Sequence, residues 1–171
     1  MRSINKRRAG VVATVLLSSV LMVFSLTQPA SAAVRSWAPW VDHNGSNCDW
    51  NDYGFVTVKT CLEEGHNGVE PTYRAILQIW NGKSTGVQMS AAVINMWAVP
   101  SPAVQIRDDG CLNSGLSGGY GATCYGTVAT RSAVCHYKRT ATHITANAAI
   151  NIPAVSSSRL TQKSMPVYVG C

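Results

Sequence analysis

Apolar and polar residues alternate with a period of two along several stretches of the chain. The clearest stretch is 142–152, in which the apolar positions would face a core and the polar positions solvent: Ile144, Ala146, Ala148, Ile150 and Ile152. A period of two is that of a half-buried β-strand. Pro153 follows directly and ends the pattern. We therefore predict a strand over 142–152.

Weaker alternation predicts further strands over 53–61, 73–80, 103–107, 124–130, 133–138 and 167–169. The dipeptide Asn81-Gly82 follows 73–80 and is a strong signal for a two-residue hairpin turn. The returning strand would cover 86–99. One side of that strand would carry Val87, Met89, Ala91, Val93 and Trp97. Its apolar residues also fit helical spacing, so a short helix over 90–97 is the alternative to a strand.

Composition points to the same class of fold. Thr, Val, Ser, Ala, Asn and Gly dominate after residue 32, where only five leucines occur, and this usage favours strands and turns over long helices. We predict an all-β fold, a single antiparallel β-sandwich or small barrel of about seven strands. Residues 33–171 would form one domain by length.

The N-terminal segment has the three parts of a secretory signal peptide. Its basic start is Arg2, Lys6, Arg7 and Arg8. An apolar run over Val11–Leu26 follows, and then Ala30-Ser31-Ala32 as a cleavage site. The run has 16 residues, and a membrane-spanning helix needs about 20. We predict that 1–32 is removed after Ala32, which leaves a secreted, extracellular domain, 33–171, with no membrane span.

The net charge is much smaller once the predicted signal peptide is left out. The whole chain carries +6, but four of its 14 basic residues lie in the signal. The ten basic and eight acidic residues that follow leave +2. The longest basic run after residue 32 is Lys138-Arg139. This distribution does not support nucleic-acid binding.

Six cysteines follow the signal, an even number that predicts disulfides in an exported chain. Six cysteines allow 15 pairings. We favour the sequential set: Cys48–Cys61, Cys111–Cys124 and Cys135–Cys171. Structural zinc sites have a close C-x₂₋₄-C pair, which this chain lacks. We predict neither a metal nor a cofactor.

The stretch HNGSNCDWNDY, 43–53, gathers a histidine, two carboxylates, a thiol and two aromatic rings. Its beginning, with Asp42, Asn44 and Ser46, resembles a calcium loop. Asn47 and Tyr53 stand where that loop needs glycine and glutamate. Clusters of Asn, Asp, Gly and Ser mark turns, so a polar turn held by a disulfide is the favoured interpretation.

Catalytic patterns are weak. Gly115–Gly119 matches G-x-S-x-G with Ser117 as nucleophile, but that motif acts only between a strand and a helix. His136 and His143 would lie on neighbouring strands without a third metal ligand. Two carboxylate doublets precede glycines in what we expect to be solvated turns, Glu63-Glu64 and Asp108-Asp109. The chain therefore favours a binding function over catalysis.

Tryptophans offer the best candidate for a binding surface. All five follow the signal, and Trp37, Trp40 and Trp50 lie within fourteen residues, with Tyr53 close behind. Aromatic rings on a rigid sheet can stack on sugar rings or on side chains of a protein partner. The alternative is that they close an open end of the core.

These features predict a secreted, disulfide-stabilised, non-catalytic binding protein. Its partner would be a glycan, a cell-wall polymer or another extracellular protein, with Trp37, Trp40, Trp50 and Tyr53 as contact residues. One alternative is a secreted protease inhibitor that presents the loop between Cys111 and Cys124, because a preorganised loop binds tightly. The other is a small secreted hydrolase. No family resemblance is evident in the sequence.

Overall fold

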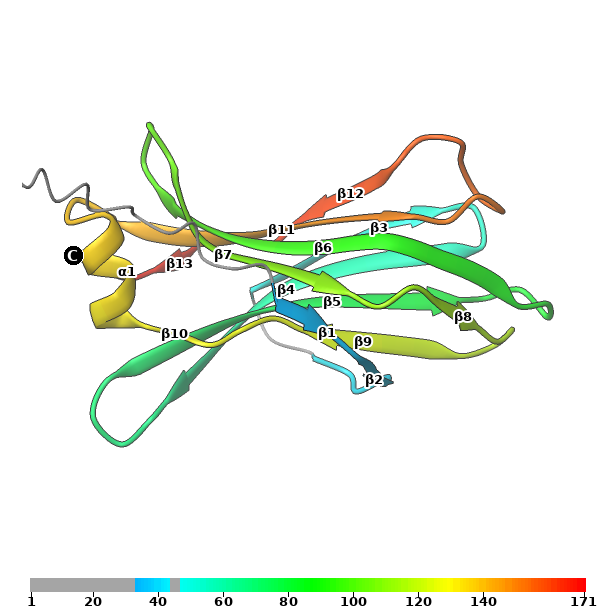
Figure 1. The fold of residues 1–171 in the computed structure, drawn as a ribbon, viewed down its shortest axis with the longest axis horizontal. Helices are drawn as coiled ribbons and strands as arrows, with labels where there is room; N and C mark the ends of the chain where they lie inside the picture. Colours follow the sequence, from blue (N-terminus) through cyan, green and yellow to red (C-terminus); the bar gives the residue numbers. More distant parts are fainter. Residues whose placement is uncertain (1–32, 44–46) are drawn as a thin grey trace, which may run out of the picture.

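The structure, a computed structural model, describes residues 33–43 and 47–171. The predicted signal peptide, 1–32, therefore lies outside the described residues. Within them, thirteen strands and one short helix form the fold (Figure 1). The all-β prediction is confirmed. There are more strands than the number, about seven, that alternation predicts. The reason is that several strands are only two or three residues long.

The larger of two sheets is named the β6 sheet after its central strand. Its strands are β1 (Ala33–Arg35), β6 (Val87–Val99), β7 (Val104–Cys111), β8 (Ser114–Leu116), β11 (His143–Asn151), β12 (Leu160–Lys163) and β13 (Val167–Tyr168). The order is β1-β7-β6-β11-β12, with β13 beside β11 and β8 beside β6. Its pairs are antiparallel apart from β1 with β7.

The smaller sheet is named the β5 sheet. Its strands are β2 (Trp37–Pro39), β3 (Cys48–Tyr53), β4 (Val56–His66), β5 (Pro71–Asn81), β9 (Gly121–Tyr125) and β10 (Ala129–Thr130). The order is β2-β9-β5-β4-β3, with β10 beside β5, and all pairs are antiparallel. The long hairpin of β4 and β5 is the centre of this sheet (Figure 1).

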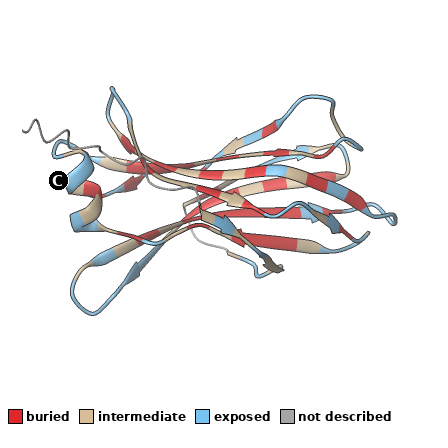
Figure 2. Ribbon diagram, viewed as in Figure 1, coloured by how far each residue is buried: buried red, intermediate tan, exposed pale blue. Residues whose placement is uncertain are grey.

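One hydrophobic cluster joins the two sheets. It takes Val58, Leu77 and Ile79 from the β5 sheet and Ile94, Met96 and Ile150 from the β6 sheet, all fully buried. Buried and exposed residues alternate along the strands (Figure 2). In β11 the apolar positions predicted to face a core are all buried, so that prediction is confirmed. Each fully buried aliphatic side chain of this kind stabilises the fold by about 1.5–3 kcal/mol.

A bulge in β6 changes which of its side chains face the core. Val87 and Met89 are buried as predicted, but Ala91 adopts φ 49°, and beyond it the buried residues occupy the even positions. The register jumps from Ser90 opposite Asn151 to Val93 opposite Ala149, the mark of an inserted residue. The prediction that Ala91, Val93 and Trp97 lie on the same side as these two buried residues was therefore wrong. The strand over 86–99 is confirmed in place of the helix.

The hairpin predicted at Asn81-Gly82 was wrong. Strands β5 and β6 lie in different sheets, because β5 already has β4 and β9 on its two edges. Asn81 is fully buried and holds the crossover: its Nδ2 donates to the carbonyls of Thr85 (2.9 Å) and Ser117 (3.2 Å). The residue acts as a hydrogen-bonding anchor between sheets.

The strand predicted over 133–138 is instead a helix, α1 (Arg131–Tyr137). Thr130 caps it by accepting a hydrogen bond from Ala133 N at 3.2 Å. The Glu70 carboxylate, from the loop between β4 and β5, accepts bonds from Ser132 N (2.7 Å) and Oγ (2.6 Å). These bonds from Ser132, side chain first and backbone second, lower the pKa of Glu70.

Both carboxylate doublets lie in strands, so their prediction as solvated turns was wrong. Strand β7 continues through Asp108-Asp109, and Asp109 is 2% exposed. Its carboxylate accepts bonds from Thr127 N (2.8 Å) and Thr127 Oγ1 (2.6 Å) and lies 3.6 Å from Arg35 Nε. Glu63-Glu64 lies within β4. At Asp109, polar partners replace the solvent that the local sequence suggested, whereas Glu64 remains exposed to solvent.

The cysteines are paired in the sequential order. Disulfides join Cys48 to Cys61 between β3 and β4, Cys111 to Cys124 between the two sheets, and Cys135 of α1 to Cys171 at the end of the chain. The first therefore joins two adjacent strands of one sheet, the second links the two sheets covalently, and the third ties the end of the chain to α1.

Candidate functional site

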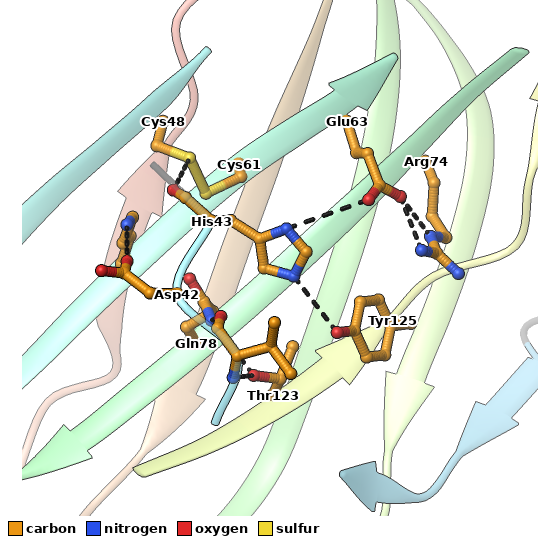
Figure 3. A network of polar contacts seen from close by, with 11 residues as sticks. Asp42, His43, Cys48, Cys61, Glu63, Arg74, Gln78, Thr123 and Tyr125 are labelled. Atoms are coloured by element: carbon orange, nitrogen blue, oxygen red, sulfur yellow. Dashed lines mark hydrogen bonds and ion pairs between the residues drawn. A yellow bond between two sulfur atoms is a disulfide. The ribbon is translucent and has the colours of Figure 1, made fainter. Parts of the chain in front are cut away.

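A short segment, Trp40–His43, crosses the outer face of the β5 sheet, the side away from the core. We call it the strap. Gln78 Nε2 donates to the Val41 carbonyl (2.5 Å) and to Thr123 Oγ1 (3.1 Å), and Val41 N donates to the same hydroxyl (3.5 Å). Gln78 and Thr123 are fully buried beneath it (Figure 3). The strap thus covers polar groups that would otherwise lie open on the sheet.

His43 anchors one end of the strap. Its Nε2 lies 3.1 Å from Tyr125 Oη, and its Nδ1 lies 3.8 Å from Glu63 Oε1 (Figure 3). Arg74 holds the same carboxylate through Nε (2.9 Å) and Nη2 (2.6 Å). The Arg74 guanidinium also lies 4.4 Å from the centre of the Tyr125 ring. Polar and cation–π contacts hold these four side chains together, and the network positions the strap on the sheet.

At the other end of the strap lies a pocket of about 350 Å³, which we call the aromatic pocket. Its lining residues are Trp40, Trp50, Thr57, Lys59 and Trp80. Strand register explains the grouping, because Trp50 pairs with Lys59 and Thr57 pairs with Trp80 on adjacent strands. Trp40 comes from the strap and meets Trp80 edge to face, with 5.9 Å between ring centres.

The absence of a side chain at Gly121 lets Trp40 reach this position. A Cβ atom at Gly121 would lie 2.6 Å from the Trp40 ring, closer than any real contact of that kind. Gly121 pairs with Trp80 across β9 and β5. Glycine at this position therefore leaves the space in which the Trp40 ring packs beside Trp80.

Two of the three indoles are open to solvent. Trp50 is 61% exposed and Trp80 is 39% exposed. Tryptophan is usually well buried, so two such rings beside a third form a marked apolar patch on a polar sheet face.

Polar groups border the rings. Lys59 Nζ lies 3.3 Å from Asp42 Oδ1, and the Lys59 side chain is 13% exposed. Thr57 Oγ1 donates to Asp52 Oδ1 at 2.5 Å. The pocket therefore combines flat apolar surfaces with an ammonium, a hydroxyl and two carboxylates, a set that can hold a ligand with alternating apolar and hydroxyl-bearing faces.

The four aromatic residues singled out in the sequence separate into two groups. Trp40 and Trp50 line the aromatic pocket. Trp37 packs against the core and donates from Nε1 to the Leu112 carbonyl (2.7 Å). Tyr53 also packs against the core, because it lies three positions from Trp50 on β3 and so faces the other way.

Sequence reasoning missed Trp80, Thr57 and Lys59. The alternation over 73–80 places Trp80 on the same side as Gln78, away from the core, and this signal was present in the sequence. What the sequence lacked was the pairing of β3, β4 and β5, which brings positions thirty residues apart into one pocket.

The stretch 43–53 is a strand rather than a turn for most of its length, since Cys48–Tyr53 forms β3. The calcium-loop hypothesis rested on Asn44 and Ser46, which lie outside the described residues. No group of three or more potential metal-binding side chains occurs within 33–43 and 47–171.

The two catalytic patterns lack the required setting. Ser117 is exposed in the turn after β8, and strand β9 follows it where the nucleophile motif needs a helix. His136 lies on α1, so the prediction that it shares neighbouring strands with His143 was wrong. Between Cys111 and Cys124, β8 pairs with β6 and β9 pairs with β5, so much of this loop is held within sheets.

Comparison with protein-family profiles gave no match, and no curated protein matched the chain. Within the residues that the structure describes, no helix combines the length and hydrophobicity needed to cross a membrane.

Proposed function

We propose that this protein is a secreted carbohydrate-binding protein whose two sheets form a β-sandwich. In this proposal 1–32 acts as a signal peptide cleaved after Ala32, and the aromatic pocket binds sugar rings of an extracellular glycan or cell-wall polymer. The signal-like sequence and the three disulfides support export. The single core shared by both sheets supports the sandwich.

The observation that carries the proposal is the grouping of Trp40, Trp50 and Trp80 around one open pocket. The C–H faces of sugar rings stack on indoles, while their hydroxyl groups need donors and acceptors at the edge. Lys59 and Asp42 supply both at the rim.

The polar rim narrows the class of ligand. An aromatic cage also suits a quaternary ammonium group, which makes no hydrogen bonds. Here the Lys59 ammonium lines the pocket, and the Asp42 carboxylate lies 3.3 Å from it and offsets its charge. The hydroxyl groups of a sugar can use both this donor and this acceptor. We therefore favour a neutral saccharide over a cationic ligand.

The test is the double variant Trp40→Ala/Trp50→Ala. Loss of both stacking surfaces should weaken binding to the best ligand in a panel of neutral polysaccharides at least tenfold, measured by calorimetry. Tyr168→Ala is the matched control, because Tyr168 is also exposed (70%) but lies on the β6 sheet. Binding by the double variant equal to that of the control would exclude the aromatic pocket.

Stability must be measured beside binding. The single variant Trp50→Ala removes a ring that is mostly exposed, so its thermal unfolding should match that of the unmodified protein. If it unfolds instead, Trp50 is a structural residue and the assignment of the pocket is wrong.

A further inference from the structure

A groove of about 530 Å³ lies on the outer face of the β6 sheet, on the opposite sheet from the aromatic pocket. We call it the amide groove. Its lining includes Val93, Asn95, Asn147, Ala149, Gln162 and Lys163. Three of these six residues carry carboxamides. Neither an aromatic ring nor a carboxylate occurs among the described residues that line it.

Strand register arranges five of these side chains in two rows, whereas Gln162 pairs with the buried Ala148 and therefore lies on the core side of its strand. Asn95 of β6, Asn147 of β11 and Lys163 of β12 are direct partners across three strands. Val93 and Ala149 form the neighbouring pair, two positions further along β6 and β11. A polar row therefore runs beside a small apolar row. The bulge at Ala91 causes this arrangement, because it turns the odd positions of β6 away from the core.

The carboxamide of Asn147 is the unusual group in the polar row. Its Oδ1 is shielded from solvent and makes no hydrogen bond to any residue that the structure describes. Polar groups in such a position are nearly always paired in native proteins. Asn147 also lines the groove, and a half turn about the terminal bond of its side chain exchanges Oδ1 and Nδ2, so the groove side of the amide can present a donor or an acceptor.

Its neighbour Asn95 is already engaged. In the orientation of its amide that satisfies its surroundings, Asn95 Nδ2 donates to Asp108 Oδ1 at 2.7 Å. That bond fixes Asn95 beside Asn147, whose Oδ1 makes no hydrogen bond to any described residue.

The charge and the side chains of the amide groove limit the class of ligand that it can bind. Lys163 is exposed and is the ionic group among the lining residues, so a cationic ligand is disfavoured. No ring is present for stacking, so recognition must come from hydrogen bonds and from contact with Val93 and Ala149. An acetamido group has the matching parts: an N–H donor, a C=O acceptor and a methyl group.

We infer that the amide groove binds the acetamido group of an N-acetylated sugar. Asn147 pairs with the amide of the ligand, its methyl group packs on Val93 and Ala149, and Lys163 donates to a ring hydroxyl. This site does not depend on the aromatic pocket, and the two would make the protein bivalent for a glycan that contains both kinds of surface.

The experiment is a nuclear magnetic resonance titration of the purified ¹⁵N-labelled protein with the tetramer of N-acetylglucosamine. The side-chain amide signals of Asn147 should shift. The glucosamine tetramer lacks the acetyl group and is cationic, and cellotetraose lacks the nitrogen, so neither should shift these signals. Asn147→Ala should weaken binding at this site roughly tenfold, whereas Gln88→Ala, an exposed amide elsewhere on β6, should not.

The double variant Trp40→Ala/Trp50→Ala separates this inference from the proposed function, because it should keep the full response of the Asn147 side-chain amide. The inference is overturned if the acetylated tetramer leaves those signals unmoved. It is also overturned if cellotetraose moves them equally, or if an N-acetylated tetrapeptide binds there and the sugar does not. Because the titration uses the unmodified protein, a folding defect in Asn147→Ala cannot mask the result.

Discussion

The outer faces of the two sheets carry opposite kinds of surface. On the β5 sheet, three tryptophans and a lysine form a pocket beside the strap. On the β6 sheet, carboxamides and small apolar residues form a groove that no strap covers. Both faces are built from the same two-residue alternation of strands. Their difference arises from two local departures from it, the strap at Trp40–His43 and the bulge at Ala91.

This contrast shows how a regular sheet acquires distinct surfaces. The strap adds side chains from outside the sheet, so the aromatic pocket depends on contacts between distant segments. The bulge changes only which side chains of β6 point outward. The amide groove therefore depends on strand register alone. A change that displaces the strap should therefore affect one face and leave the other as it is.

Gly121→Ala should have the largest effect on the difference between the two outer faces, because it should change one of them only. The added Cβ would lie 2.6 Å from the Trp40 ring, and the strap would have to move. Such overpacking costs about 1–3 kcal/mol of unfolding free energy. We expect binding at the aromatic pocket to fall at least tenfold, by calorimetry, with no change at the amide groove.

Gly110→Ala is the matched control on the β6 sheet. Its Cβ would meet only the Ala92 carbonyl, at an ordinary 3.7 Å, so both sites and the unfolding free energy should stay within experimental error of the unmodified protein. Unchanged saccharide binding in Gly121→Ala would show that Trp40 contributes nothing to the pocket.

Acidification gives a smaller effect that should leave both faces intact. Hydrogen bonds from Ser132 lower the pKa of Glu70 in the folded protein below its usual 4.5. A lowered pKa means that the contact stabilises the fold above that value and that its contribution is lost as the pH falls through the lower, folded pKa. Glu70→Gln should therefore melt at a lower temperature than the unmodified protein at pH 7, and the difference between their melting temperatures should shrink as the pH falls below 4.5.

Glu64→Gln serves as the control for that comparison, as an exposed carboxylate on the same hairpin. A melting difference between Glu70→Gln and the unmodified protein that stays the same from pH 7 down to the pH at which Glu70 is fully protonated would show that the carboxylate charge has no part in holding α1.

The sequence predicted the parts of the fold that depend on local pattern. Strong alternation located β11 and its buried face, and the even cysteine count with short spacings favoured the pairing that the structure has. Local pattern also separated the outward side of β5, with Trp80, from its inward side. Trp40 and Trp50 were predicted as contact residues because they lie close together in the sequence. They share one pocket because the strap crosses the sheet, and an alternating pattern cannot predict that crossing.

The wrong predictions arose where contacts between residues far apart in the sequence override the local preference. Asn81-Gly82 has the chemistry of a hairpin turn, but both edges of β5 are taken, so the chain crosses to the other sheet. Helix α1 is stabilised partly by Glu70, sixty-two positions from its partner Ser132. The bulge at Ala91 has no glycine to mark it. None of these determinants lies within a window of neighbouring residues.

The five indole N–H signals test the account most directly, because each tryptophan reports on one place in the fold. During titration with the neutral saccharide that binds best, the signals of Trp40, Trp50 and Trp80 should shift together. Those of Trp37, packed on the core, and Trp97, on the β6 sheet, should stay. Shifts confined to Trp37 or Trp97, or no shift in any indole signal while the saccharide binds, would contradict the assignment of the aromatic pocket.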